Sequence, residues 1–156
     1  MKQLQINDQD AQRLIKMLKN IFDDHNIDLS VQPEGVIKIE GSGDISFILD
    51  YKYAASKTSF NFRETKYNYT LLRINLNDNF HKNADGTRVS GPRINVFSEK
   101  EFEDKGDNHT HYKAYPLPYD TIPKSNDFYE VLIELLKYTN TNNSDKISFQ
   151  QSIISI

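Results

Sequence analysis

The feature that most constrains the fold is a run of short segments between residues 36 and 118, in which apolar and polar residues alternate. Alternation with a period of two is typical of strands that bury one face, because successive side chains point to opposite sides of a strand. Glycine, proline and asparagine residues stand between several of these segments and indicate turns. We therefore predict an antiparallel sheet of five or six strands, formed by residues 36–40, 45–51, 58–64, 67–76, 93–98 and 112–118.

A helix is predicted on each side of this run. Residues 11–22 carry apolar side chains at three- and four-residue spacing, and Asp8 precedes them as a candidate helix cap. Residues 128–136 show the same spacing, with Ser125 or Asn126 as the cap. The order helix, strands, helix predicts an α+β fold in which an N-terminal and a C-terminal helix pack on one face of the sheet.

The length of 156 residues is that of one typical domain. We expect residues 1–140 to form a single α+β domain. Residues 141–156 begin as a polar linker and end as an apolar tail, and we expect this tail to dock on the domain or to add a strand to it. The sequence carries no signal for the oligomeric state.

The composition excludes several kinds of site. The chain has no cysteine, so disulfides, thiolate zinc sites and a cysteine nucleophile are excluded. It has 19 Lys and Arg against 22 Asp and Glu, and the net charge of −3 argues against strong direct binding to nucleic acid. No apolar run approaches the roughly 20 residues that span a bilayer, and no apolar signal-peptide segment opens the chain. We expect a cytoplasmic protein with no membrane partner.

Four residues are the candidates for a metal or acid–base site, namely His81, Asp85, His109 and His111. His109 and His111 would point to the same face of a strand, which is a known arrangement for two metal ligands. A third ligand at a fixed local spacing is missing, and so are the HExxH and EF-hand motifs. We therefore predict no metal, no cofactor and no catalytic residue. A metal-dependent hydrolase or nuclease that uses these four residues is the alternative.

Aromatic and basic residues are interleaved over the middle strands. Two helices can cover only one face of the sheet, so the other face is expected to be open. Alternation along the strand predicted at 67–76 places Tyr67 and Tyr69 on this open face. Arg73 follows on the same side, and Arg63 lies on the preceding strand. Tyr and Arg are enriched at interface hot spots, so these four residues are predicted to bind a partner. The same composition suits single-stranded RNA, and an RNA-binding module is the third hypothesis.

Residues 98–108 are rich in carboxylates and are predicted to form an acidic loop. Such a loop is most often a solvated surface, but it can also steer the approach of a basic partner. Glu99, Glu101 and Glu103 are the residues predicted to take this second role.

The stretch LLRINLNDNFHKNADGTRVSGPRINVFSE, followed by YKAYPLP, resembles a small uncharacterised family of Gram-positive bacteria, their phages and their mobile elements. The shared pattern is a strand R-I-x-L, a histidine, an Asp-Gly turn, Gly-Pro and a final A-x-PLP. The matching residues are Arg73, Ile74, Leu76, His81, Asp85, Gly86, Gly91, Pro92, Ala114, Pro116, Leu117 and Pro118. The resemblance covers roughly residues 70–136.

This chain departs from that pattern after the Gly-Pro. Members of the family tend to carry His-x-His there, where this chain has Arg93, Ile94 and Asn95. The departure implies that any chemistry of those histidines is absent here. The resemblance then implies a macromolecule-binding protein without catalysis, which a phage or mobile element uses to inhibit a host defence nuclease. Small anti-defence proteins, including inhibitors of type II CRISPR nucleases, share its size and acidity. The implied partner is a host protein, such as a CRISPR nuclease or its guide-RNA complex.

Overall fold

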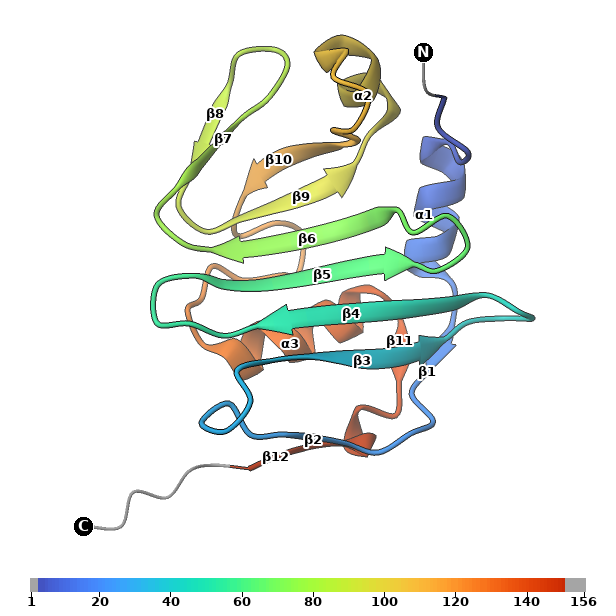
Figure 1. Ribbon diagram of the computed structural model, residues 1–156, viewed down its shortest axis with the longest axis vertical. Helices are drawn as coiled ribbons and strands as arrows, with labels where there is room; N and C mark the ends of the chain where they lie inside the picture. Colours follow the sequence, from blue (N-terminus) through green and yellow to red (C-terminus); the bar gives the residue numbers. More distant parts are fainter. Residues whose placement is uncertain (1–2, 151–156) are drawn as a thin grey trace.

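The computed structural model describes residues 3–150 (Figure 1). Its main sheet has eight strands in the spatial order β10 (Tyr112–Pro116), β9 (Arg93–Phe97), β6 (Thr70–Leu76), β5 (Thr58–Glu64), β4 (Ser46–Lys52), β3 (Glu34–Glu40), β1 (Lys19–Asn20) and β11 (Thr141–Asn142). Neighbouring strands are antiparallel, except that β1 and β11 run parallel.

Two helices, α1 (Asp8–Lys16) and α3 (Phe128–Tyr138), lie behind this sheet in Figure 1 and cover one of its faces. The apolar stripes of both helices and the inward-facing side chains of the strands form one continuous core. Phe128 of α3, for example, packs against the rings of Tyr51 and Phe60. The predicted α+β class and the antiparallel character of the sheet are confirmed.

The predicted count of five or six strands is wrong, because the sheet has eight. The missed strands β1 and β11 contain two residues each, which is too short to show an alternating pattern. They pair with each other, and β1 also pairs with β3, so they extend the sheet at one edge.

The N-terminal helix is shorter than predicted. It ends at Lys16, because Met17 has an extended conformation and the chain then enters β1. Leu18 and Phe22 continue the helical spacing in the sequence, yet both are exposed and neither belongs to a helix. None of the helices in residues 3–150 has the length and apolar character needed to cross a membrane.

A third helix, α2 (Glu99–Lys105), replaces the predicted acidic loop. Ser98 caps it by accepting a hydrogen bond from the Glu101 amide. Gly106 ends it in the left-handed conformation, with a φ of 62°. The spacing of Ser98 and Glu101 is that of a capping box, so the sequence did contain a signal for this helix.

A hairpin of β7 (Phe80–Lys82) and β8 (Arg88–Ser90) rises beside β10 and α2 (Figure 1). Gly86 at its turn has a φ of 92°, which is the positive value that the predicted Asp-Gly turn requires. The Asn83 side chain donates to the Ala114 carbonyl at 3.0 Å and accepts from the Ala114 amide at 2.9 Å. These two bonds fix the hairpin to the outer edge of β10.

The predicted linker and tail are largely bound to the rest of the protein. After β11, the short 3₁₀ helix η1 (Ser144–Lys146) leads into β12 (Ile147–Phe149). β12 pairs in parallel with β2 (His25–Ile27) in a separate two-stranded sheet. Residues 151–156 of the predicted tail lie outside the described residues.

Candidate binding surface on the open face of the sheet

The face of the main sheet opposite α1 and α3 carries neither of these helices, and we call it the open face. Cross-strand pairing arranges its side chains in rows that run across the sheet. The first row contains Lys38, Ile48, Arg63 and Thr70; the second Val36, Asp50, Asn61, Arg73 and Asn95; the third Glu34, Lys52, Ser59, Asn75 and Arg93. Most of these side chains are polar, whereas the opposite side of the same strands is apolar.

Polar contacts join the side chains in the middle of the open face. Arg63 forms an ion pair with Asp50 at 2.8 Å, and the Asn61 side chain donates to the same carboxylate. Arg63 also donates to the Asn68 side chain at 2.7 Å. The charge of Asp50 is therefore already neutralised within the protein.

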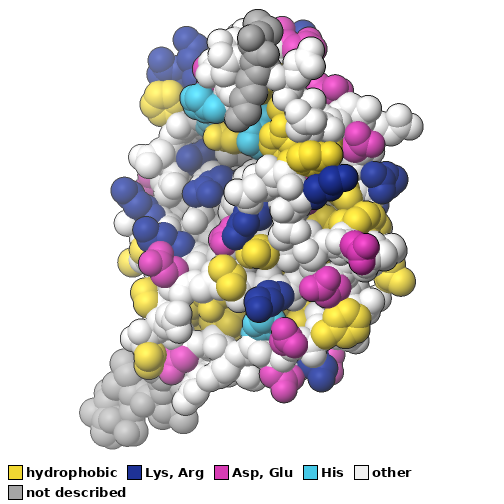
Figure 2. Space-filling view, turned by 45° about the vertical axis from the view of Figure 1, so that its right-hand side comes forward, with side chains coloured by type: hydrophobic (Ala, Val, Ile, Leu, Met, Phe, Trp, Pro, Cys, Tyr) yellow, Lys and Arg dark blue, Asp and Glu magenta, His cyan; other side chains and the backbone are white. Residues whose placement is uncertain are grey.

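The other cations of the open face have no carboxylate partner. In the described part of the chain, Lys38, Lys52, Arg73 and Arg93 form no ion pair. Glu34 and Glu40, on the same side of β3 as Lys38, also lack an ion pair there, so four cations stand against two carboxylates. Figure 2 shows Lys and Arg side chains spread over the visible surface, with Asp and Glu side chains among them. The open face is therefore locally positive, although the whole chain has a net charge of −3.

Exposed apolar side chains adjoin these cations at the β1 edge of the sheet. Val36 on β3 is 46% exposed, and Phe22, just after β1, is 63% exposed. Because Lys19 and Ile21 point into the core, strand alternation turns Leu18 and Phe22 to the opposite side, toward the open face. Apolar and aromatic side chains next to cations are typical of protein interfaces.

The structure separates the four residues predicted to share an aromatic and basic surface. Arg63 and Arg73 lie on the open face, in neighbouring strands. Tyr67 and Tyr69 lie in the turn before β6, which begins only at Thr70. Tyr67 is 41% exposed there. The arginines and the tyrosines therefore belong to different parts of the surface.

A β-bulge explains part of this difference. Phe62 pairs with Leu72, but the next residue, Arg63, pairs with Thr70, so Leu71 is an extra residue in β6. The alternation predicted over residues 67–76 is broken at this point. Tyr67 and Tyr69, which precede the bulge, consequently do not share a face with Arg73 as the sequence pattern implied.

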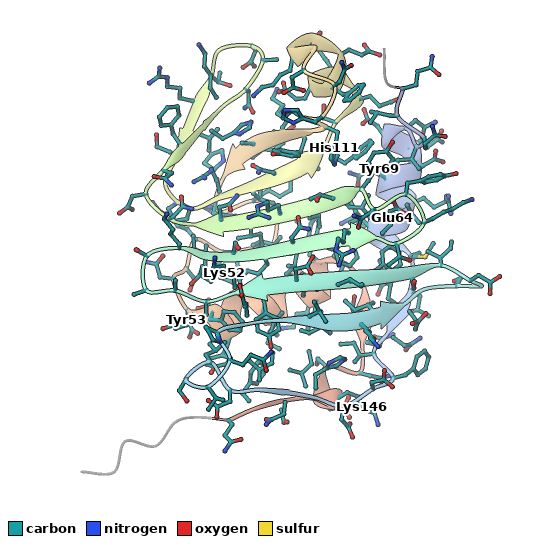
Figure 3. All side chains as sticks on the ribbon, in the orientation of Figure 1. Lys52, Tyr53, Glu64, Tyr69, His111 and Lys146 are labelled. Atoms are coloured by element: carbon teal, nitrogen blue, oxygen red, sulfur yellow. The ribbon has the colours of Figure 1, made fainter. Side chains whose placement is uncertain are left out.

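Tyr69 takes part in the packing of the protein itself. Its ring contacts the rings of Phe97 and His111, with centroids 6.1 and 5.3 Å away, and its hydroxyl accepts a hydrogen bond from the Gln5 amide at 3.0 Å. Figure 3 shows Tyr69 and His111 close together, with Glu64 nearby. The Glu64 carboxylate is buried and accepts a hydrogen bond from the Tyr69 amide at 2.9 Å, which fixes the turn.

Glu99, Glu101 and Glu103 do not form a common acidic surface. Glu101 is buried, and its carboxylate accepts a hydrogen bond from the Ala84 amide in the β7–β8 turn at 3.0 Å. Glu99 accepts one from the Asp8 amide at the start of α1, at 3.1 Å. Glu103 is exposed on α2. Two of the three carboxylates thus hold elements of the fold together.

The four candidates for a metal site, His81, Asp85, His109 and His111, have different surroundings. His81 and His111 each contact the ring of Tyr112, with centroids 5.7 and 5.5 Å apart. Asp85 lies in the β7–β8 turn, and His109 is exposed in the loop before β10. In residues 3–150, no three His, Asp or Glu side chains gather in a way that could hold a metal ion.

Sequence reasoning overlooked two polar residues of the open face, Arg93 and Asn95. Both lie on β9 beside β6, and Asn95 pairs with Arg73. The strand predicted at 93–98 contained the signal, because alternation places Arg93 and Asn95 on one side and the apolar Ile94 and Val96 on the other.

Comparisons with curated proteins and with solved structures give no match. A family model matches residues 6–141, from before α1 to the start of β11. The match fits the expectation of an uncharacterised family. The chain therefore belongs to this family, which is described as a family of unknown function (DUF6978).

Proposed function

We propose that this protein binds another protein through the open face of its sheet and catalyses no reaction. The observation that carries the proposal is the presence of unpaired cations beside exposed apolar side chains on this face. Val36 and Lys38 show the combination on a single strand, since both are exposed and both point away from the core. Phe22 and Arg73 add to this surface an aromatic residue and an arginine, which are the residue types enriched at protein interfaces.

The charge of the open face indicates the chemistry of the partner. Lys38, Lys52 and Arg73 are free to pair with carboxylates of another molecule, because Asp50 is already bound to Arg63. A complementary surface would carry acidic side chains around an apolar centre. We therefore propose a protein partner with an acidic patch. The glutamates of α2, which were predicted to meet a basic partner, do not belong to this surface.

The sequence resemblance supplies a finer form of the proposal, in which the partner is a host defence nuclease such as a type II CRISPR nuclease. The small size, the net charge of −3 and the resemblance to proteins of phages and mobile elements support it. Addition of the purified protein to a DNA cleavage reaction of such a nuclease tests it directly. We expect inhibition by the wild-type chain and loss of inhibition when the open face is altered.

The proposal that the open face binds another protein is tested by affinity capture with paired variants. The double variant Val36→Asp, Lys38→Glu alters the open face. The control Val31→Asp, Lys57→Glu makes the same two changes at exposed positions in loops outside the rows. We expect wild type and control to capture the same protein partner, and the open-face variant to lose it with an unchanged melting temperature.

Two outcomes of this experiment would contradict the proposal. Capture of the same partner by all three proteins would place the binding surface elsewhere. Capture of RNA that ribonuclease removes, with no protein left bound, would favour the RNA-binding hypothesis.

A further inference from the structure

Three buried polar atoms near the β9 end of the open face have no hydrogen-bond partner in the described residues. They are Nε of Arg93, Oδ1 of Asn95 and Nε2 of His81. Arg93 and Asn95 are only 7% and 4% exposed. A buried polar group without a partner costs about 1–3 kcal/mol, so a ligand or an ordered water normally satisfies it.

These atoms come from facing elements of one region. Arg93 and Asn95 project from β9 on the side of Arg73, because Asn95 pairs with Arg73 and Arg93 pairs with Asn75. His81 lies on β7 of the hairpin beside β10. Burial lowers the pKa of His81, and the nearby cations Lys105 and Arg93 lower it further. The hairpin therefore brings His81 close to Arg93.

The positive charge of this region is not neutralised by the protein. Burial lowers the pKa of Arg93, and the adjacent guanidinium of Arg73 lowers it further. The hydrogen bonds of Arg93 all go to neutral oxygens, those of Asn77, Asn79 and Gly91 at 2.8, 3.0 and 3.0 Å. Two like charges thus lie close together, and within residues 3–150 neither has an anionic partner.

The carboxylate that acts on this region is Glu101 of α2. It opposes the lowering of the pKa of His81. Its oxygen already accepts a hydrogen bond from the Ala84 amide, so it holds the hairpin turn. At His81, the two cations Lys105 and Arg93 therefore act against this carboxylate. At Arg73, Asp50 and Glu34 line the same surface hollow, and Asp50 is already paired with Arg63.

We propose that an oxyanion of the phosphate type binds between Arg73 and Arg93 on the open face. A phosphate group carries about −1.5 to −2 charges at pH 7, which matches the two guanidinium groups. Guanidinium donors pair with phosphate oxygens in a planar, two-pronged geometry. Bound there, the anion would accept a hydrogen bond from Arg93 Nε, whereas Oδ1 of Asn95 is itself an acceptor and would not be satisfied by the anion. A carboxylate has one charge and would leave one guanidinium without a counterion.

This inference does not rest on the proposed protein partner, because a free ion and a phosphorylated molecule share the same chemistry. Inorganic phosphate is the first probe, and phenyl phosphate is the second. Binding of the ion alone would support a site for free phosphate. Binding of the ester as well would support a site that accepts a phosphoryl group of a larger molecule.

The test is calorimetric titration of the full chain with inorganic phosphate, at an ionic strength held constant with sodium chloride. The variant Arg73→Gln removes one guanidinium that makes a single hydrogen bond in the described residues, to Asn75 at 3.3 Å. The control Arg88→Gln removes the same charge from an exposed position on β8, where the guanidinium lies 4.7 Å from the Phe80 ring centroid.

We expect saturable phosphate binding by the wild type and by Arg88→Gln, and binding at least about tenfold weaker by Arg73→Gln, as loss of a charge-assisted hydrogen bond predicts. Arg73→Lys keeps the charge without the two-pronged geometry and should bind with intermediate affinity. Absence of phosphate binding by the wild type would overturn the proposal and leave ordered water as the partner of the buried atoms. Equal binding by wild type and Arg73→Gln would also overturn it, since the anion would then bind elsewhere.

Discussion

Lys19 is fully buried although it carries an ammonium group. Its Nζ donates to the carbonyl oxygens of Ile15, Met17 and Thr139 at 2.7, 2.9 and 2.7 Å. Ile15 lies in the last turn of α1 and Thr139 directly follows α3. The carbonyl ends of helices carry partial negative charge, which offsets part of the cost of burying an ammonium group there. One side chain thus joins the C-terminal ends of both helices that cover the sheet.

We predict that Lys19→Met lowers the free energy of unfolding by about 2–4 kcal/mol, because buried carbonyl groups lose their hydrogen-bond donor. Urea denaturation of the variant and the wild type measures this difference. Lys137→Met is the control, because Lys137 is exposed on α3 and its Nζ pairs with Glu134 at 3.4 Å. If the two variants had the same stability, the hydrogen bonds of Lys19 would not contribute to it.

The pKa of Lys19 also predicts how the free energy of unfolding depends on pH. Burial lowers its pKa from 10.5 to about 7, with a smaller contribution from Lys16. The unfolded chain then binds this proton more tightly than the folded protein does, so the free energy of unfolding rises as pH increases above 7. The slope from one such group is at most about 1.4 kcal/mol per pH unit.

We expect urea denaturation between pH 7 and pH 9 to show this rise in the wild type and not in Lys19→Met. The window stops below the titration of tyrosine, because burial raises the pKa of Tyr138 to about 12 and so adds an effect of opposite sign at higher pH. Parallel pH profiles of the two proteins would mean that Lys19 keeps its ordinary pKa in the folded state.

At the scale of elements, the β7–β8 hairpin depends on one amide side chain. Asn83 binds both backbone groups of Ala114, and so occupies the edge of β10 as a neighbouring strand would. Asn83→Ala leaves a buried N–H and a buried C=O without partners, and we predict a loss of about 1–3 kcal/mol.

Hydrogen exchange locates the predicted effect of Asn83→Ala. We expect faster exchange in residues 80–90 and unchanged exchange in β4 and β5, because the change loosens the hairpin and not the centre of the sheet. Asn79→Ala is the matched control, since Asn79 is exposed and its side chain makes no hydrogen bond within residues 3–150. Uniform acceleration across the sheet would mean that the hairpin is not a separate unit.

How accurately each element was predicted depends on how many alternating or periodically spaced residues it contains. The strands β3, β4, β5, β9 and β10 show several alternating residues and were predicted to within about two residues at each end. The helix α1 was predicted too long, because Leu18 and Phe22 continue its apolar spacing although they lie outside the helix. Lys19, which binds the carbonyl of Ile15 at the end of α1, also binds the carbonyl of Thr139, which is distant in sequence. Contacts between residues so far apart in the sequence leave no local pattern from which they could be predicted.

The residues of the candidate surface also differ in whether a local sequence pattern predicts their position. Arg63 and Arg73 were predicted on the surface of neighbouring strands, because alternation holds within β5 and, in β6, after the bulge. Tyr69 was misplaced with them, because the bulge at Leu71 has no glycine or proline to mark it. Glu101 was predicted to steer a basic partner, but it is buried, and its carboxylate binds the Ala84 amide of a hairpin that only the tertiary structure brings near.

At the scale of the whole molecule, the two ends of the described chain meet in parallel pairings. β1 pairs with β11, and β2 pairs with β12, so residues 19–27 are bound along residues 141–149. Parallel pairing of segments so distant in sequence requires the sheet between them to be in place, because closing a long loop is entropically unfavourable. These pairings are therefore expected to form late in folding and to open first.

Removal of β12 tests this arrangement. A chain that ends at Asn143 keeps β11 but loses Ile147, which is buried, and Phe149, whose ring lies 4.5 Å from that of Tyr129. We predict that it folds with a loss of about 2–4 kcal/mol, close to the value for burial of two large apolar side chains, and that the amides of β2 exchange rapidly.

A chain that ends at Gln150 is the matched control for this deletion, because it keeps β12 and removes only residues that follow it. Comparison with this chain isolates the contribution of residues 144–150 to stability. Complete unfolding of the chain that ends at Asn143 would show that β12 is required to form the main sheet. Unchanged stability would show that the β2–β12 pair adds nothing to it. The predicted result lies between these, because the main sheet and both covering helices precede β12 in the sequence and contact each other without it.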